Sequence, residues 1–108
     1  MKLVKLYTLR YAYRPDVLLK RVPYRDEHLK WVKQYLEEGK CLSVGTCNPP
    51  PSALSTKEDD GPTVPTGALF VFKDESSAQE YVRGDPYCAK AKDIVAAHTI
   101  EEWNTIEF

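Results

Sequence analysis

The sequence contains few cysteines, and none has a spacing that gives cysteine a structural task. Its three cysteines are Cys41, Cys47 and Cys88, an odd number, and none belongs to a Cys-x-x-Cys pair. Neither a disulfide framework nor a zinc site is indicated. We expect reduced thiols, no bound metal and no organic cofactor.

Long apolar runs are also missing. No stretch reaches the roughly 20 apolar residues of a membrane-spanning helix. Lysines interrupt residues 1–6 too often for the core of a signal peptide. We therefore expect no membrane association and a cytoplasmic location.

The chain has no excess of charge of one sign, since it carries 15 Lys and Arg against 16 Asp and Glu among 108 residues. Binding of nucleic acid needs a concentrated basic surface that releases counterions, so no nucleic acid partner is expected. The first 35 residues nevertheless hold nine basic and three acidic side chains. This imbalance fits either an ordinary solvated face or a surface that attracts a small anionic ligand.

Short apolar runs rich in β-branched and aromatic residues predict strands. The predicted strands cover residues 3–9, 41–47, 66–73 and 94–106. Residues 10–20 are expected to form a loop, because Pro15 interrupts any regular element. In the second strand, Gly45 could allow a bulge or the close approach of another group.

Apolar residues spaced by three and four predict two helices. The first covers residues 23–38, and Pro23 suits its first turn. The second begins at a cap formed by Asp74 or Ser76 and ends at Gly84.

Residues 48–65 are rich in proline and charge and show no periodic apolar face. Loops of this length are uncommon in small domains unless they are lids or lack fixed structure. We expect a mobile segment here rather than a defined lid.

The predicted order of elements is strand, helix, strand, strand, helix, strand, in one domain over residues 1–108. This is the order of a ferredoxin-like α+β fold, an antiparallel sheet with its helices on one face. The opposite face must be covered, and a second copy of the same sheet would cover it. A homodimer is therefore expected.

His28 is the first candidate for chemistry. It lies three residues after Arg25 on the predicted first helix, at the margin of the apolar stripe, so the two side chains share a face. A histidine titrates near neutrality and can transfer protons during turnover. It can equally be a half-buried histidine that bonds a backbone carbonyl.

Asp85 is the second candidate, and it precedes Pro86 directly after the second helix. An Asp-Pro pair often marks a turn in which the carboxylate bonds its own backbone. Alternatively, Asp85 holds His28 in one tautomer and favours the imidazolium.

Other reactive side chains have weaker support. His98 is expected to be a structural residue of the last strand, and Cys88 has no neighbour in sequence that would activate it. Tyr11 and Tyr13 are interpreted as packing or pocket-wall aromatics rather than acids.

The chain resembles the YCII-related domain family from Leu3 to about Asn104. The resemblance depends on four motifs and a later tryptophan, which are residues 23–29 (Pro-Tyr-Arg-Asp-Glu-His-Leu), Val44-Gly45, residues 66–72, Asp85-Pro86-Tyr87 and Trp103. Two segments depart from the family pattern. Residues 88–93 lack the usual glycine-containing turn, and residues 48–65 are longer than the usual hairpin.

The resemblance implies a dimeric α+β barrel of ferredoxin-like subunits with a pocket around a His-Asp pair. His28 matches the family histidine, Asp85 the aspartate, Arg25 an arginine three positions before the histidine, and Gly45 a glycine on the second strand. One branch of the family is similar to dehydrochlorinases that act on chlorinated hydroxyquinones. The fold alone does not fix the substrate.

Three hypotheses of function follow. The first is a metal-free enzyme in which His28, oriented by Asp85, moves a proton on a small anionic or phenolic compound that Arg25 holds, in a lyase, isomerase or dehydrochlorinase-like reaction. The second is a non-catalytic small-ligand-binding or regulatory dimeric module with the same pocket. The third, a structural dimerisation domain, would leave the His-Asp pair without a task.

Overall fold

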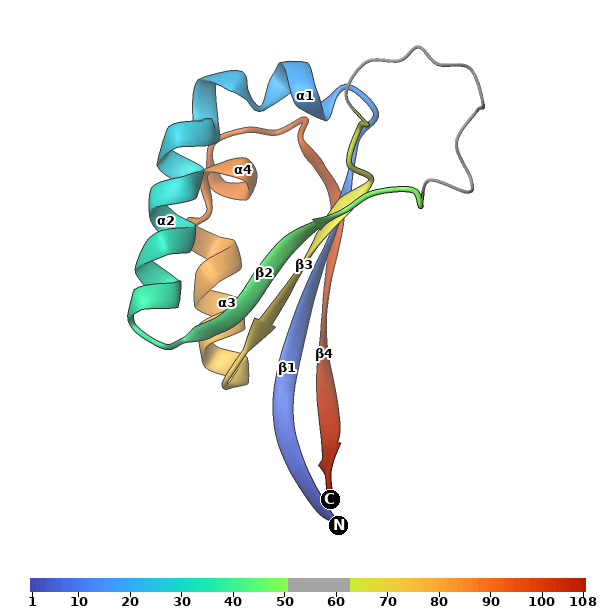
Figure 1. Ribbon diagram of the computed structural model, residues 1–108. Helices are drawn as coiled ribbons and strands as arrows, with labels where there is room; N and C mark the ends of the chain where they lie inside the picture. Colours follow the sequence, from blue (N-terminus) through green and yellow to red (C-terminus); the bar gives the residue numbers. More distant parts are fainter. Residues whose placement is uncertain (51–62) are drawn as a thin grey trace.

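The structure is a computed structural model that describes residues 1–50 and 63–108 (Figure 1). Its strands are β1 (Lys2–Tyr13), β2 (Cys41–Cys47), β3 (Gly67–Phe72) and β4 (Val95–Glu107). Its helices are α1 (Val17–Lys20), α2 (Arg25–Glu37), α3 (Glu75–Gly84) and α4 (Pro86–Ala89), and a 3-10 turn, η1 (Val22–Tyr24), precedes α2. The α+β class predicted from the sequence is confirmed.

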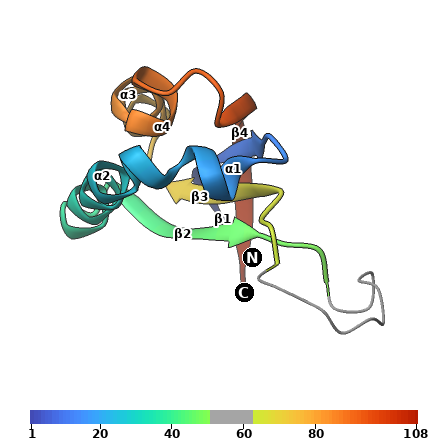
Figure 2. The same cartoon turned by 90° about the horizontal axis from the view of Figure 1, so that it is seen from above.

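The four strands form one antiparallel sheet in the order β2-β3-β1-β4. The helices lie together on one side of this sheet (Figures 1 and 2). Among the described strands, residues 2–6 of β1 pair with β4 alone, because the pairing of β1 with β3 begins at Tyr7. The two chain ends therefore lie side by side at the tip of a two-stranded extension (Figure 1).

The core lies between the sheet and the helices. Alternate residues of β1 and β3 point into it, so that Leu9, Tyr11, Phe70 and Phe72 are all buried. From the helical side, Tyr81 packs on both phenylalanine rings, at centroid distances of 4.9 Å and 5.4 Å. Burial of each such aromatic ring contributes about 1.5–3 kcal/mol to folding.

Gly67 fixes where β3 lies against β1. A Cβ atom at this position would overlap the backbone carbonyl oxygen of Tyr11, so no larger residue fits without displacing a strand. The close approach places Tyr11, which contributes to the site described below.

The loop predicted over residues 10–20 is wrong in two respects. Residues 10–13 continue β1, because Tyr11 turns into the core and the strand pairs on both sides. The short helix α1 then follows Pro15, anchored by the fully buried Val17. Proline interrupted the strand after Tyr13 without preventing structure on either side of it.

The other predicted boundaries need smaller corrections. Pro23 lies in the 3-10 turn, and α2 begins at Arg25. The cap of α3 is Asp74, whose carboxylate accepts a hydrogen bond from the Ser77 backbone N–H at 2.8 Å. Pro86 opens the helix α4 rather than a simple turn.

The prediction for residues 48–65 falls mostly outside the described residues. Residues 48–50 and 63–66 lack regular secondary structure, in agreement with the proline content there. Mobility of the segment stays a prediction. In the described part of the chain, no helix combines the length and the apolar composition needed to cross a membrane.

Candidate functional site

The carboxylate of Asp85 is the centre of a buried polar network. Its Oδ1 atom accepts hydrogen bonds from His28 Nδ1 at 2.7 Å and from the Tyr87 backbone N–H at 3.1 Å. Its Oδ2 atom accepts a hydrogen bond from the Tyr11 hydroxyl at 2.7 Å. The side chain is fully buried. A buried carboxylate is costly unless it is hydrogen-bonded, and these three donors supply that compensation.

Three separate elements bring the network together. Tyr11 comes from β1, His28 from the first turns of α2, and Asp85 from the junction between α3 and α4. At this junction Asp85 has an extended backbone and also caps α4. The same carboxylate bonds both its own turn and His28. Its effect on the tautomer and charge of His28 stays a prediction.

The bond to Asp85 determines which nitrogen of His28 can act as a base. An ionised carboxylate only accepts hydrogen bonds, so Nδ1 of His28 carries the hydrogen. In the neutral ring Nε2 then has a free lone pair, and in the imidazolium form the charge is balanced by Asp85. His28 is 7 % exposed, so the ring is nearly enclosed but reaches solvent.

The ring of Tyr87 fixes the plane of His28. The two rings are stacked with centroids 3.7 Å apart and planes only 3° from parallel. Since Tyr87 also donates its backbone N–H to Asp85, one residue orients both members of the pair.

His28 lines a cavity of about 390 Å³ between α2 and the sheet. The volume is near the lower end of the range for small-molecule sites. Besides His28, its wall holds the arginines Arg21 and Arg25, several apolar side chains, and polar groups of β2. The apolar and aromatic members are Tyr13, Leu18, Leu29, Val32, Val44, Pro65, Ala68, Phe70 and Tyr87.

The structure brings all four residues predicted for the site to this region. His28, Arg25 and Gly45 line the cavity, and Asp85 lies directly behind His28. The bulge suggested at Gly45 occurs instead between Cys41 and Ser43. No protein atom of the described residues lies within 4 Å of the position that a Cβ of Gly45 would take, so the glycine leaves open space.

Two residues of the site were missed in the sequence. Tyr11 was interpreted as a packing or wall aromatic, but its hydroxyl donates to Asp85. Burial, and then the charge of Asp85, raise the pKa of this hydroxyl far above its usual range, so it remains a donor. The alternation of Leu9, Tyr11 and Tyr13 was the available signal. Arg21 was also missed, because it lies before the predicted helix.

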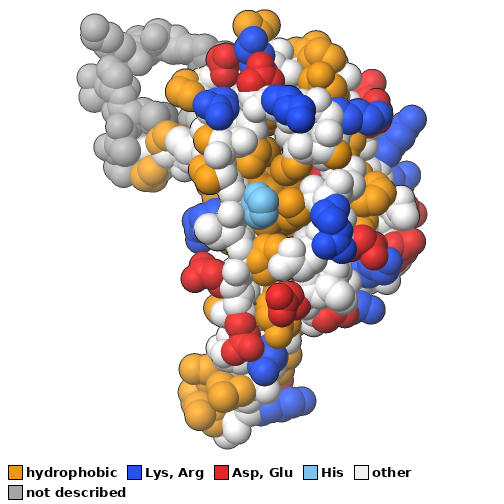
Figure 3. Space-filling view, turned by 180° about the vertical axis from the view of Figure 1, so that it is seen from behind, with side chains coloured by type: hydrophobic (Ala, Val, Ile, Leu, Met, Phe, Trp, Pro, Cys, Tyr) orange, Lys and Arg blue, Asp and Glu red, His pale blue; other side chains and the backbone are white. Residues whose placement is uncertain are grey.

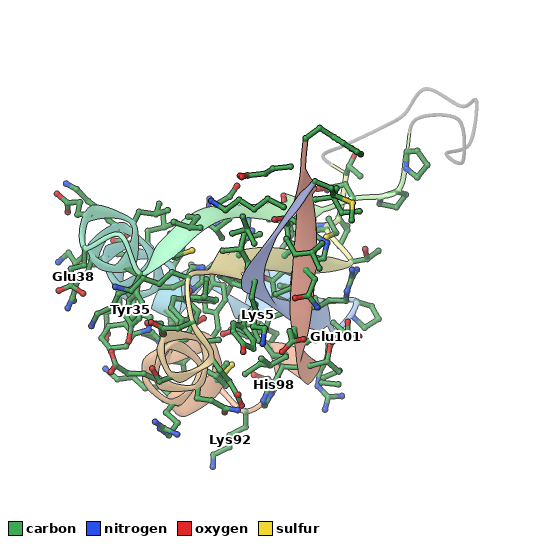
Figure 4. The ribbon with its side chains drawn as sticks, turned by 90° about the horizontal axis from the view of Figure 1, so that it is seen from below. Lys5, Tyr35, Glu38, Lys92, His98 and Glu101 are labelled. Carbon is green, nitrogen blue, oxygen red and sulfur yellow. The ribbon has the colours of Figure 1, made fainter. Side chains whose placement is uncertain are left out.

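The other reactive side chains lie outside the cavity wall. His98 is exposed on β4 (Figure 4), and its structural role stays a prediction. Burial raises the pKa of the Cys88 thiol to about 11, which keeps it protonated and unreactive at neutral pH. Tyr81 has a buried hydroxyl without a hydrogen-bond partner among the described residues, and burial raises its pKa.

Metal chemistry has no obvious ligand set in the described part of the chain. No group of three or more His, Cys, Asp or Glu side chains is arranged there to hold an ion.

The fold and the site together define a class of protein. It is a small α+β domain with a buried His-Asp pair behind a ligand-sized cavity. The family model of the YCII-related domain matches residues 6–104, and the chain belongs to this family. Comparison with curated proteins gives no match.

A solved structure has a similar fold. It is 5-chloro-2-hydroxyhydroquinone dehydrochlorinase (TftG) from Burkholderia phenoliruptrix AC1100, in complex with 2,5-dihydroxybenzoquinone. The similarity has a TM-score of 0.63 and covers 91% of this chain and 92% of that chain, at 22% sequence identity. At this identity the likeness establishes the shared fold.

Proposed function

We propose that this protein is a small-molecule enzyme in which His28, oriented by Asp85, transfers a proton on a small anionic or phenolic compound. The observation that carries the proposal is the 2.7 Å bond between His28 Nδ1 and the buried Asp85 carboxylate, at the wall of a ligand-sized cavity. A general base needs a free lone pair, a partner that stabilises its protonated form, and access to substrate. His28 has all three.

The reaction class is an elimination or isomerisation that begins with loss of a proton from carbon or oxygen. Nε2 of His28 takes the proton, and the electron pair left behind forms a new double bond. In a dehydrochlorination that pair displaces chloride, so hydrogen chloride is lost overall. In an isomerisation the imidazolium returns the proton to another atom of the same substrate. No electron acceptor is needed in either case.

The fold neighbour gives the proposal its first test substrates. TftG is a dehydrochlorinase, and its structure contains 2,5-dihydroxybenzoquinone. Arg25 would hold an acidic oxygen of such a compound, while the apolar wall contacts the ring. A module that binds the same compound without turnover is the rival function.

The decisive experiment measures chloride release from 5-chloro-2-hydroxyhydroquinone and proton exchange in related hydroxyquinones. His28→Ala should lower turnover by about 100- to 10,000-fold, as expected for loss of a general base. His98→Ala is the matched control, since His98 is exposed on β4 and outside the cavity wall, and should leave turnover unchanged.

The variant Asp85→Asn tests the charge of this side chain while keeping its size. The amide keeps the size of the side chain but removes the charge that balances the imidazolium, so turnover should fall by roughly 100-fold or more. Unchanged turnover in His28→Ala would refute the enzyme mechanism. Tight binding of 2,5-dihydroxybenzoquinone with no measurable reaction in the parent protein would establish the binding module instead.

We also propose that two copies pair through the sheet face without helices, as ferredoxin-like subunits of a dimeric α+β barrel. In support, this face carries Leu6, Leu69, Val71 and the 47 % exposed Trp103. The cytoplasmic location expected from the sequence stays a prediction.

A further inference from the structure

Arg21, Arg25 and His28 form a stripe along one side of a continuous helical path. Arg21 has a helical backbone, and η1 leads directly into α2, so the spacings of four and three residues place the three side chains on the same face. All three line the cavity. His28 therefore has two guanidinium groups in the turns before it.

Both arginines lack a carboxylate partner among residues 1–50 and 63–108, where neither takes part in an ion pair. The described wall of the cavity contains no Asp or Glu side chain. Some lysines elsewhere do form ion pairs, as in Lys90–Glu27 and Lys20–Asp93. The cavity thus has a positive wall that its described neighbours do not balance.

Tyr87 lines the same cavity as the two arginines and His28. Burial raises the pKa of the Tyr87 hydroxyl, and the charges of Arg21 and Arg25 oppose this rise. The ring of Tyr87 is stacked on His28 at 3.7 Å. The two arginines and the stacked His28–Tyr87 pair therefore belong to one cavity wall.

We propose that Arg21 and Arg25 act together as a clamp for a planar anion with two oxygen atoms, either a carboxylate or the conjugated acid group of a hydroxyquinone. This inference rests on the proposed function and specifies its substrate class. Planar guanidinium groups match such oxygen pairs in geometry as well as charge. The clamp holds the anionic end of a ring compound while the far part of the ring reaches His28. Neutral compounds of the same shape are rejected, because they would leave two guanidinium groups without an anionic partner from the described residues.

The test is a calorimetric comparison of two anions with their neutral counterparts. Benzoate is compared with benzamide, and 2,5-dihydroxybenzoquinone with 2,5-dimethoxybenzoquinone. At least one anion should bind about tenfold or more tightly than its counterpart, because a hydrogen bond to a charged group is lost in each neutral compound. The pair that shows the preference identifies the carboxylate or the hydroxyquinone as the source of the anion.

The variants Arg21→Gln and Arg25→Gln should each weaken binding of the preferred anion by about tenfold. Arg21→Lys keeps the charge but loses the paired donors, so its affinity should lie between those of the parent protein and Arg21→Gln. Arg14→Gln is the control with the same change in charge, at an exposed residue outside the cavity wall. It should bind the anion as the parent protein does.

Three results would refute the clamp. They are an affinity for the anion that does not change in Arg21→Gln, an equal loss of anion affinity in Arg14→Gln, and equal affinities for the anions and their neutral counterparts. Absence of binding of either anion would also overturn it. These outcomes differ from failure of the proposed function. Clamp-dependent binding without turnover would retain the clamp and reject the enzyme, whereas His28-dependent turnover that ignores Arg21 would do the reverse.

Discussion

The hydroxyl of Tyr11 contributes to the site through Asp85, on the side of the carboxylate away from His28. Tyr11 is 1% exposed, and its hydroxyl donates a hydrogen bond to Oδ2 of Asp85. The bond keeps the carboxylate from rotating, so that Oδ1 stays directed at His28 and the Tyr87 backbone N–H. Tyr11 therefore acts on the base through Asp85 rather than by touching substrate.

Tyr11→Phe should lower the free energy of unfolding by about 1.5–3 kcal/mol, since a hydrogen bond to a buried charged group is lost. The fraction of neutral His28 with its proton on Nδ1 should also fall, because Asp85 is less firmly held. Urea unfolding measures the first effect, and ¹⁵N NMR of the histidine ring measures the second.

Tyr13→Phe provides the comparison for this prediction. Tyr13 lies two residues along β1 and lines the cavity, but its hydroxyl makes no hydrogen bond within the described residues. Its removal should change stability by less than about 0.5 kcal/mol. A shift of the His28 tautomer as large as that in Tyr11→Phe would show that the Asp85 contact is not what orients the ring.

Part of the site could be predicted residue by residue from the sequence, and Tyr11 could not. His28 and Asp85 were candidates because a helical histidine and a carboxylate after the second helix can form a pair, and the resemblance to the YCII-related domain family supported them together with Arg25. Tyr11 was assigned only to packing or a pocket wall because a buried tyrosine packs in the same way whether or not its hydroxyl has a partner. Only the fold brings its hydroxyl to a residue 74 positions away.

At the scale of elements, the start of α3 depends on one carboxylate. Asp74 accepts a hydrogen bond from the Ser77 backbone N–H. The side chain of Ser77, and after it this backbone N–H, lower the pKa of Asp74. Both Asp74 and Ser76 fit the capping patterns in the sequence, which could not separate them. The extended backbone of Asp74 makes it the cap, while Ser76 lies within the first turn.

Asp74→Ala should lower the free energy of unfolding by about 1 kcal/mol at neutral pH, as for loss of other helix caps. Because the folded-state pKa is lowered, the charged cap stabilises fully above the ordinary pKa of 3.8. Its contribution is lost as the pH falls through the lowered value. Chemical unfolding at pH 7 and at about pH 2.5 therefore should give a difference between parent and variant that shrinks in acid.

Ser76→Ala serves as the control for the cap. Its hydroxyl donates to Asp74 Oδ1 at 3.1 Å on the surface, so its removal should have a smaller effect than removal of the carboxylate. A larger loss in Ser76→Ala, or a difference for Asp74→Ala that does not depend on pH, would contradict the assignment.

The sequence predicts the bounds of an element correctly where a local signal determines them. The prediction is wrong where the bounds depend on pairing across the sheet. The apolar residues of α2 and the short run of β3 gave those elements from spacing alone. Residues 10–13 were missed as strand because their stability depends on two neighbours distant in sequence, β3 and β4. Local breakers such as Pro15 do not reveal such neighbours.

On the scale of the whole molecule, the sheet is covered on one side only. Its open face has apolar side chains at Leu6, Leu69 and Val71 with Trp103 beside them. A second apolar group occupies the narrow end of the molecule (Figure 3), where Met1, Leu3, Ile106 and Phe108 are exposed at the tip of the two-stranded extension. Exposed apolar surface of this extent is typical of an interaction surface.

A second copy is the occupant that fits the open face, because closed pairs bury the same surface twice with no further partner. The face is not uniformly apolar, since Arg10 and Glu101 also belong to it. A two-fold axis can place unlike charges of the two copies opposite each other. Such pairing would fix the register of the sheets and would add little affinity of its own.

The whole chain should therefore have a mass in solution of about twice 12.3 kDa. Trp103→Glu should shift the protein toward the monomer, because a charge buried in a sheet interface loses its hydration without a partner. Leu19→Glu makes the same kind of change at a 72 % exposed leucine of α1, on the helical side, and should leave the mass unchanged. Sedimentation equilibrium over micromolar concentrations measures both. A parent protein that sediments as a monomer would refute pairing through the sheet, and a dimer indifferent to Trp103→Glu but broken by Leu19→Glu would move the interface to the helices.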